Sequence, residues 1–223
     1  MAPWPDGLAL ILDLDGVIVD SAAVHAACWR EYLRRCGLEV PEARAQKMFG
    51  WRNDHIVPEF FGPHLTPAEI ARHGAAKEVL YRQMMKPQLK AHLVPGVAEF
   101  LERRRDAPLG LASNAEAQNV EFVLRSAGLR RYFRVVLDGN QVERPKPDPQ
   151  IYLRAARLLR VPPGNCIVFE DSFSGVAAAR AAGARVVGVG TTHAALPDAD
   201  VNVRDFLQPE LEAWLEIQRP SPI

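Results

Sequence analysis

Carboxylates, a hydroxyl and an ammonium follow short apolar runs at four places in the chain. The first run, residues 8–12, is followed by Asp13 and Asp15. Later runs are followed by Ser113 and Asn114, by Lys146, and by Glu170 and Asp171. Ligands of open α/β sheets bind at the carboxyl ends of the strands. If the apolar runs are neighbouring parallel strands, these side chains therefore meet in one site.

The residue types of this set suit phosphoryl transfer assisted by a metal ion. Clustered carboxylates repel one another unless a cation or protons intervene, and an all-oxygen ligand set favours Mg²⁺. One aspartate can attack phosphorus, and another two residues away can act as general acid and base. A serine hydroxyl, a backbone amide and a lysine can hold phosphoryl oxygens and stabilise developing charge. Each motif alone is common in turns and on solvated surfaces. Their order, each at the end of an apolar run, indicates a site.

The elements that must position these groups alternate along most of the chain. Short, continuous apolar runs are typical of parallel strands that are covered on both faces. Strands are expected at 8–12, 109–112, 135–137, 166–169 and 185–189. Helices are expected at 115–127, from Pro149 onward and at 172–182, with glycine after the first and third and Asp148 as the N-cap of the second. This alternation predicts an α/β fold with an open parallel sheet.

Residues 20–92 break the alternation. Apolar residues of 21–36 fall on one half of a helical wheel, which predicts a helix. Thr66 and Glu69 flank a proline in a capping-box pattern, which starts a second helix that extends to about residue 85. No strand pattern stands out between them. We therefore expect an all-helical insert at 20–92 and an α/β core made of 1–19 and 93–223.

The composition of the chain limits the classes of function that it can have. The chain has 223 residues, 48% of them hydrophobic, and its 27 basic and 27 acidic side chains give zero net charge. A globular fold is expected, and a nucleic-acid or membrane-coating role is not. No apolar run reaches the roughly 18 residues of a membrane span, and no signal-peptide pattern opens the chain. The three cysteines lack metal-ligand spacing and are expected to be reduced. A cytoplasmic protein is predicted, with a monomer favoured.

The complete motif set resembles that of the haloacid dehalogenase-like (HAD) hydrolase superfamily. The resemblance rests on DLDGVIVD at 13–20, Ser-Asn at 113–114, Lys-Pro at 146–147 and Glu-Asp-Ser at 170–172. It covers nearly the whole chain and is strongest to the branch that contains β-phosphoglucomutase and the sugar phosphate phosphatases with a small cap. The resemblance implies a Rossmann-like parallel-sheet core and a mobile helical cap inserted after the first strand.

The same resemblance implies a role for each matching residue. Asp13 would be the nucleophile, and Asp15 the general acid and base. The phosphoryl group would be held by Ser113, the Asn114 amide and Lys146. A Mg²⁺ cofactor would be held by Asp13, the backbone carbonyl of Asp15, Asp171 and Glu170, with Glu170 either ligating the ion or supporting it.

The resemblance leaves two activities open. Water as the acceptor of the phosphoryl group makes a phosphatase, whereas a bound sugar hydroxyl makes a mutase. β-Phosphoglucomutases typically carry a Ser-x-Ser-Lys-Asn run after the second motif, but residues 113–117 read Ser-Asn-Ala-Glu-Ala. We therefore expect a phosphatase that acts on a small phosphorylated metabolite, with sugar phosphates favoured. β-Phosphoglucomutase is the alternative.

Other classes fit the residues less well. Dehalogenases of the superfamily lack the second aspartate, which is present here as Asp15. A non-catalytic sensor on this fold would typically have lost Asp13 or Asp15. A response-regulator receiver has neither the helical insert nor the DxDG motif.

Residues of the insert are candidates for substrate recognition. Arg52 and Asn53 are candidate specificity residues, with a solvated turn as the alternative. His25 matches a histidine that related mutases place near the acid/base aspartate, but it also falls among apolar residues of its helix. Lys77 and Arg82 could face a cleft, although a solvated helix face is more common for such side chains.

Overall fold

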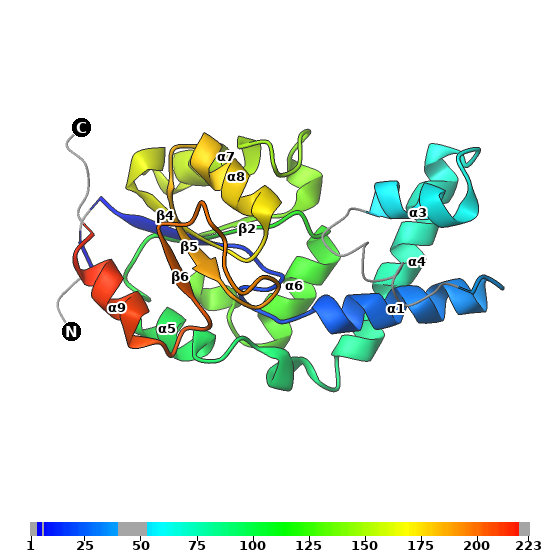
Figure 1. Ribbon diagram of the computed structural model, residues 1–223, viewed down its shortest axis with the longest axis horizontal. Helices are drawn as coiled ribbons and strands as arrows, with labels where there is room; N and C mark the ends of the chain where they lie inside the picture. The colour runs from blue at the N-terminus through cyan, green and yellow to red at the C-terminus, as the bar shows by residue number, and fades with distance from the viewer. Residues whose placement is uncertain (1–3, 6, 40–52, 219–223) are drawn as a thin grey trace. The chain divides into compact units, whose positions relative to one another are not determined.

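The computed structural model describes residues 4–5, 7–39 and 53–218 (Figure 1). It divides the chain into two compact units, one made of Met1–Asp20 with His92–Ile223 and the other of Ser21–Ala91. The expected boundaries of the insert each lie one residue from this division. None of the helices in the described ranges combines the length and the apolar character of a membrane span.

The first unit is built on a six-stranded, fully parallel sheet with the order β3-β2-β1-β4-β5-β6. Its strands are β1 (Ala9–Leu12), β2 (Leu109–Ala112), β3 (Val135–Leu137), β4 (Cys166–Glu170), β5 (Arg185–Val189) and β6 (Val201–Val203). The predicted α/β class and parallel sheet are confirmed. β6 was not predicted because it has three residues, with the exposed Asn202 at its centre.

The ladder continues past the ends of the central strands and sets the register of the polar residues. Leu10 of β1 pairs with Leu109 of β2 on one side and with Ile167 of β4 on the other. Beyond the strands, the Asp13 amide donates to the Phe169 carbonyl at 3.1 Å. In the same way the Ser113 amide donates to the Leu137 carbonyl at 3.0 Å. The side chains that follow β1, β2 and β4 therefore emerge at one edge of the sheet.

Helices cover both faces of this sheet. They are α5 (Val97–Arg103), α6 (Ala117–Ser126), α7 (Gln150–Leu159), α8 (Phe173–Ala181) and α9 (Pro209–Glu216), with short 3-10 helices at Arg130–Tyr132, Gly139–Gln141 and Pro163–Asn165. α6 begins two residues later than expected, and α7 begins at Gln150 rather than Pro149. The N-cap is Pro149 and not Asp148 as predicted, although the Asp148 carboxylate accepts a hydrogen bond from the Gln150 amide at 2.9 Å.

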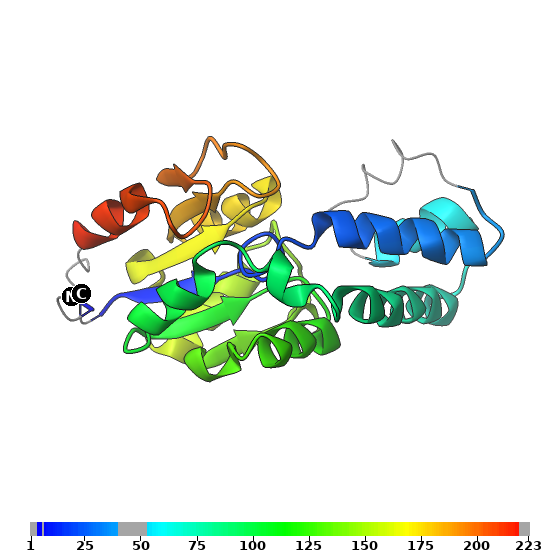
Figure 2. The same cartoon turned by 90° about the horizontal axis from the view of Figure 1, so that it is seen from below.

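Two apolar layers hold these helices. Figures 1 and 2 show α7 and α8 along one face of the sheet and α5 along the other. Side chains such as Ile11 of β1 and Val176 of α8 belong to the buried cluster on the first face. On the opposite face the rings of Phe100, Phe169 and Phe206 pack with centroids 4.9 to 5.5 Å apart. Successive side chains point to opposite faces, and because every residue of β1, β2 and β4 is buried, the sheet lies between two cores.

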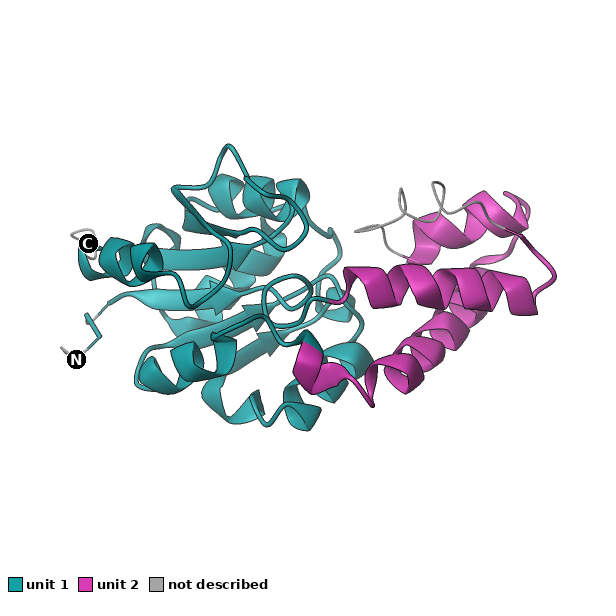
Figure 3. Ribbon diagram, turned by 60° about the horizontal axis from the view of Figure 1, so that its bottom comes forward, with its two compact units in different colours: residues 1–20, 92–223 teal, residues 21–91 magenta. Residues whose placement is uncertain are grey.

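In the second unit, coloured magenta in Figure 3, the described residues form helices joined by short turns and loops. They are α1 (Ala22–Arg35), α3 (Asn53–Phe61) and α4 (Pro67–Met85), followed by a 3-10 helix at Leu89–His92 that crosses the division. The capping box predicted for α4 is formed. Glu69 N donates to Thr66 Oγ1 at 3.3 Å, and Thr66 N donates to Glu69 Oε2 at 2.8 Å. Trp29 and Leu33 of α1 pack with Ile56 and Val57 of α3 in the core of this unit.

Glycine at position 175 is required by the close approach of α8 to the end of β4. A Cβ on Gly175 would lie 1.8 Å from Glu170 Oε1. We predict that Gly175→Ala lowers the free energy of unfolding by about 1–3 kcal/mol in urea denaturation, because the buried carboxylate must move. Gly164→Ala is the matched control, since the nearest atom to its added Cβ is 3.9 Å away. Equal losses in the two variants would contradict this account.

Candidate active site

The loop after β1 holds the two aspartates of the first motif. Asp13 directly follows the strand and is buried, whereas Asp15 is half-buried. Bonds from Gly16 N to the Val19 carbonyl and from Ile18 N to the Leu14 carbonyl, each 2.8 Å long, close the loop into a tight turn. Gly16 has φ +73°, and a Cβ there would lie 1.8 Å from Asp171 Oδ2. Both the backbone conformation and the close approach therefore require glycine.

Lys146 connects this loop to the end of β4. Its ammonium donates to Asp13 Oδ1 at 2.8 Å, to Glu170 Oε1 at 2.6 Å and to the Ala112 carbonyl at 3.0 Å. The side chain is buried, and all three donors of the ammonium are used. The Lys146–Pro147 peptide is cis. The backbone of Lys146 is fixed as well, because its amide donates to Asn114 Oδ1 at 3.2 Å.

Glu170 is the most heavily bonded carboxylate of the group. Its Oε1 accepts from Lys146 and, at 2.6 Å, from the Tyr152 hydroxyl. Its Oε2 accepts from the amides of Asp171 and Ser172 at 3.1 and 3.2 Å and from Ser172 Oγ at 3.0 Å. Five donors on two oxygens leave little room for a metal bond. The arrangement favours the supporting role for Glu170 over the ligating one.

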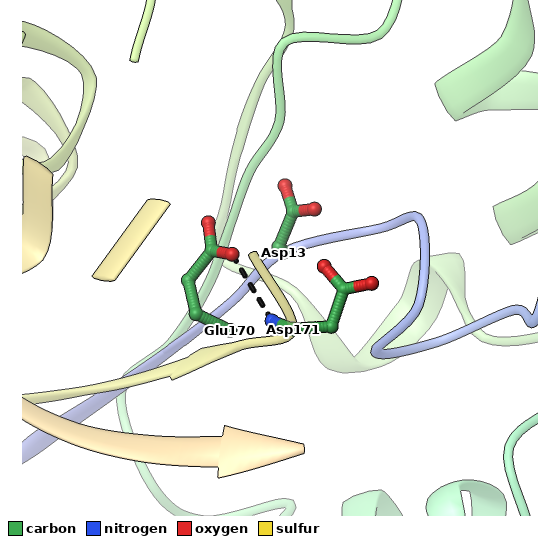
Figure 4. A group of neighbouring side chains, drawn as sticks. All are labelled: Asp13, Glu170 and Asp171. Atoms are coloured by element: carbon green, nitrogen blue, oxygen red, sulfur yellow. Dashed lines mark hydrogen bonds between the residues drawn. The ribbon is translucent and has the colours of Figure 1, made fainter. Parts of the chain in front are cut away.

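Asp13 and Asp171 have the atoms that a cation would need. Figure 4 shows the carboxylates of Asp13, Glu170 and Asp171 gathered at the ends of β1 and β4, and one oxygen of each lies within 4.8 Å of the others. Within the described part of the chain, Asp13 Oδ2 and Asp171 Oδ1 accept no hydrogen bond, whereas Asp171 Oδ2 accepts one from the Thr192 hydroxyl. Three carboxylates without a nitrogen or sulfur ligand fit a hard cation such as Mg²⁺.

Charge in this cluster is unbalanced, because three carboxylates meet one ammonium. Burial raises the pKa of Asp13 to about 7, against the opposing effect of Lys146 and with a further rise from Glu170. Burial and the charge of Glu170 raise the pKa of Asp171 to about 8. Burial alone would also raise the pKa of Glu170, but the charge and hydrogen bond of Lys146, together with hydrogen bonds from Tyr152 and Ser172, lower that pKa. A divalent cation beside Asp13 and Asp171 would restore the balance.

Ser113 and Asn114 flank the same cluster from the end of β2. Ser113 is buried, and its hydroxyl accepts a hydrogen bond from the Ala115 amide at 3.1 Å. The bond between Asn114 and the Lys146 amide ties this loop to the cluster. The structure therefore brings together Asp13, Lys146, Glu170 and Asp171 by direct contact and links Ser113 and Asn114 to them through the loop.

The candidates of the insert lie in the helical unit. His25 stacks on Tyr81 with ring centroids 3.9 Å apart, and its Nδ1 is 2.8 Å from Lys77 Nζ. Asn53 begins α3 and donates to Glu78 Oε1 at 2.8 Å. Arg52 lies outside the described residues. Lys77 is 2% exposed and not on a solvated face, and Glu78 Oε1 lies 2.8 Å from its ammonium and compensates the buried charge.

Three residues that bond to the site lie outside the sequence motifs. Tyr152 looks like an ordinary core residue because it lies on the apolar face of α7. Thr191 and Thr192 follow β5, and their hydroxyls donate to the Gly16 carbonyl at 2.6 Å and to Asp171. The position of the two threonines after a strand is the signal that could have identified them.

The raised carboxyl pKa values predict how Mg²⁺ should affect stability. The folded protein keeps protons on Asp13 and Asp171 up to about pH 7–8, whereas the unfolded chain releases them near pH 4. The free energy of unfolding therefore falls as pH rises between those limits. Mg²⁺ competes with the protons for the same carboxylates and should counteract this loss of stability. We predict a larger Mg²⁺-induced rise in Tm at about pH 8.5 than at about pH 6.

Asp171→Asn is the control for this measurement by thermal unfolding, because it removes one open carboxylate oxygen. It should abolish most of the Mg²⁺-induced rise at both pH values. A rise that is independent of pH, or that survives in Asp171→Asn, would contradict the assigned cation site.

Comparisons with known proteins place these motifs in a family. A family model described as haloacid dehalogenase-like hydrolase matches residues 8–183. Fructose-1-phosphate phosphatase of Escherichia coli is 33% identical over 183 residues, which cover 81% of this chain and 95% of that protein. β-Phosphoglucomutase of Bacillus subtilis is 28% identical over 209 residues, 92% of each chain. The crystal structure of β-phosphoglucomutase from Clostridium difficile aligns with a TM-score of 0.80 and 26% identity, covering 93% of this chain and 96% of that one. The motif resemblance is confirmed, and the chain belongs to the haloacid dehalogenase-like hydrolase family.

Proposed function

We propose that this protein is a Mg²⁺-dependent phosphatase that hydrolyses a small phosphorylated metabolite, with sugar phosphates favoured. The observation that carries the proposal is the state of Asp13. One oxygen of its carboxylate is held by the Lys146 ammonium at 2.8 Å, the other accepts no hydrogen bond within the described residues, and Asp15 lies two residues on. Similarity to a protein named fructose-1-phosphate phosphatase supports the substrate class.

The chain's own residues supply the groups for a two-step reaction. We assign Ser113 Oγ, the Asn114 amide and Lys146 to the substrate's phosphoryl oxygens; Lys146 gives up one of its three present hydrogen bonds to reach them. The Asp13 carboxylate attacks phosphorus, the bond to the leaving alcohol breaks, and Asp15 gives that oxygen a proton. Asp15, now ionised, takes a proton from water, which attacks the same phosphorus. Inorganic phosphate leaves, and the Asp13 carboxylate is regenerated.

The cation would be held by the side chains of Asp13 and Asp171 and by the backbone carbonyl of Asp15. When bound, it neutralises negative charge on the phosphoryl group and the carboxylates. Glu170 would keep Lys146 and the Asp171 backbone in place, since it accepts hydrogen bonds from both.

We assign residues 20–92 as the helical cap domain and residues 1–19 and 93–223 as the core domain. Arg52, Asn53 and His25 are its candidate substrate residues. A cytoplasmic monomer remains the prediction for location and assembly.

β-Phosphoglucomutase activity is the second candidate, and similarity to two proteins of that name favours it. The loop at 113–117 argues for hydrolysis. It lacks the second serine, lysine and asparagine of the mutase pattern, and the side chain of its one asparagine is bound to the Lys146 amide.

Phosphate release from a panel of sugar and other metabolite phosphates, with and without Mg²⁺, tests the proposal. We expect Mg²⁺-dependent release from at least one sugar phosphate. Asp13→Asn should lower kcat by at least about 10⁴-fold because the nucleophile is lost, while its circular dichroism stays native. Conversion of β-glucose 1-phosphate to glucose 6-phosphate without phosphate release would show a mutase instead. Full activity of Asp13→Asn would exclude the assigned nucleophile.

The role of Asp15 predicts a dependence on the leaving group. Asp15→Asn should lower kcat/KM for an alkyl phosphate by about 10²–10⁴-fold, because the alcohol leaves without a proton. Release of the first equivalent of p-nitrophenol from p-nitrophenyl phosphate should fall far less, since that leaving group needs no acid. Stopped-flow single-turnover rates compare the two substrates. An equal loss for both would contradict a general acid at this position.

A further inference from the structure

We infer that Tyr152 is a positioning residue that holds Lys146 on the nucleophile by bonding Glu170, an inference that rests on the proposed function. Tyr152 lies in the first turn of α7, and its side chain is 1% exposed within the apolar cluster between α7, α8 and the sheet. Its hydroxyl is the polar end of this otherwise apolar side chain, and it donates to Glu170 Oε1 at 2.6 Å. A buried hydroxyl without a partner would be costly, so the bond fixes the carboxylate from the core side.

The same oxygen of Glu170 is shared with Lys146. Lys146 Nζ donates to Glu170 Oε1 at 2.6 Å and lies 4.8 Å from the centroid of the Tyr152 ring. Tyr152 therefore contacts both members of the ion pair, one through its hydroxyl and the other through its ring. Asp13 receives the remaining charged bond of the ammonium, at 2.8 Å.

The effect on Lys146 follows from competition for one oxygen. A neutral donor on Glu170 Oε1 takes up part of the hydrogen-bonding capacity of that oxygen without adding charge. It thereby weakens the attraction of Glu170 for the ammonium and leaves the ammonium available to Asp13. Without the hydroxyl, Lys146 would be drawn toward Glu170 and away from the reacting groups. The loss should fall on the chemical step more than on substrate binding.

Tyr152→Phe is the test, because it removes one oxygen and keeps the ring. We expect kcat to fall about 10- to 100-fold. KM should change little, as for an interaction made mainly in the transition state. Tyr132→Phe is the matched control, since Tyr132 donates to Glu102 Oε2 at the same 2.6 Å, while Glu102 makes no contact with Asp13, Glu170 or Asp171. Unchanged kcat in Tyr152→Phe, or equal losses in both variants, would overturn the inference.

Rescue separates hydrogen bonding from packing. 4-Aminophenylalanine incorporated at position 152 places a neutral N–H donor where the hydroxyl was. It should restore most of the kcat that Tyr152→Phe loses, and it provides the test should Tyr152→Phe fail to fold. A folded protein with this residue and no recovery of kcat would contradict the donor role.

A measurement without substrate or metal distinguishes this inference from the proposed function. In ¹⁵N-lysine-labelled, metal-free protein, the resonance of the Lys146 ammonium should shift in Tyr152→Phe and stay in place in Tyr132→Phe. An unmoved resonance would overturn the inference even if the enzyme is a phosphatase. A shifted resonance in a protein that releases phosphate from no compound would leave the positioning role intact and reject the proposed function.

Discussion

Buried negative charge at the ends of two neighbouring strands is the constraint on which this structure depends. Asp13, Glu170 and Asp171 lie within 4.8 Å of one another at their oxygens, and one ammonium, that of Lys146, faces them. Removing ions from water costs several kcal/mol each unless charge and hydrogen bonds compensate. The negative charge of the site is therefore only partly compensated, and the pKa values of Asp13 and Asp171 are raised to about 7 and about 8. The excess of negative over positive charge opposes folding. The same excess favours binding of a divalent cation, and it leaves Asp13 with a carboxylate oxygen that could act as a nucleophile.

The fold compensates this charge by placing hydrogen-bond donors next to the carboxylates. Parallel pairing of β1 with β4 places Asp13 beside the β4 end, and the turn of the Asp13 loop needs Gly16 against Asp171. Backbone amides at the start of α8 serve one oxygen of Glu170, while Lys146 and Tyr152 serve the other. Because Glu170 is satisfied by the protein, Asp13 and Asp171 are the carboxylates of this cluster that keep an oxygen without a hydrogen bond from any described residue.

Much of this architecture could be predicted from sequence because it depends on local patterns. Apolar runs identify five of the six strands, and the polar residues after them identify Asp13, Lys146 and Asp171. What could not be predicted depends on tertiary contacts. Tyr152 has the helical spacing of a core residue, and only the fold brings its hydroxyl to Glu170. Lys77 looks like a solvated helix residue, and its burial depends on Glu78 and His25 in three-dimensional space.

In the proposed reaction the Asp13 carboxylate takes the phosphoryl group from the substrate. The most direct measurement is chemical trapping in the Asp15→Asn variant, where p-nitrophenyl phosphate can form the acyl phosphate but its hydrolysis lacks a general base. Borohydride reduction of the quenched protein converts a phosphorylated aspartate to homoserine, which peptide mass spectrometry locates. Homoserine is expected at position 13, and at no other aspartate, in proportion to the p-nitrophenol burst. A stoichiometric burst with Asp13 unmodified, or with another residue labelled, would contradict the proposed reaction.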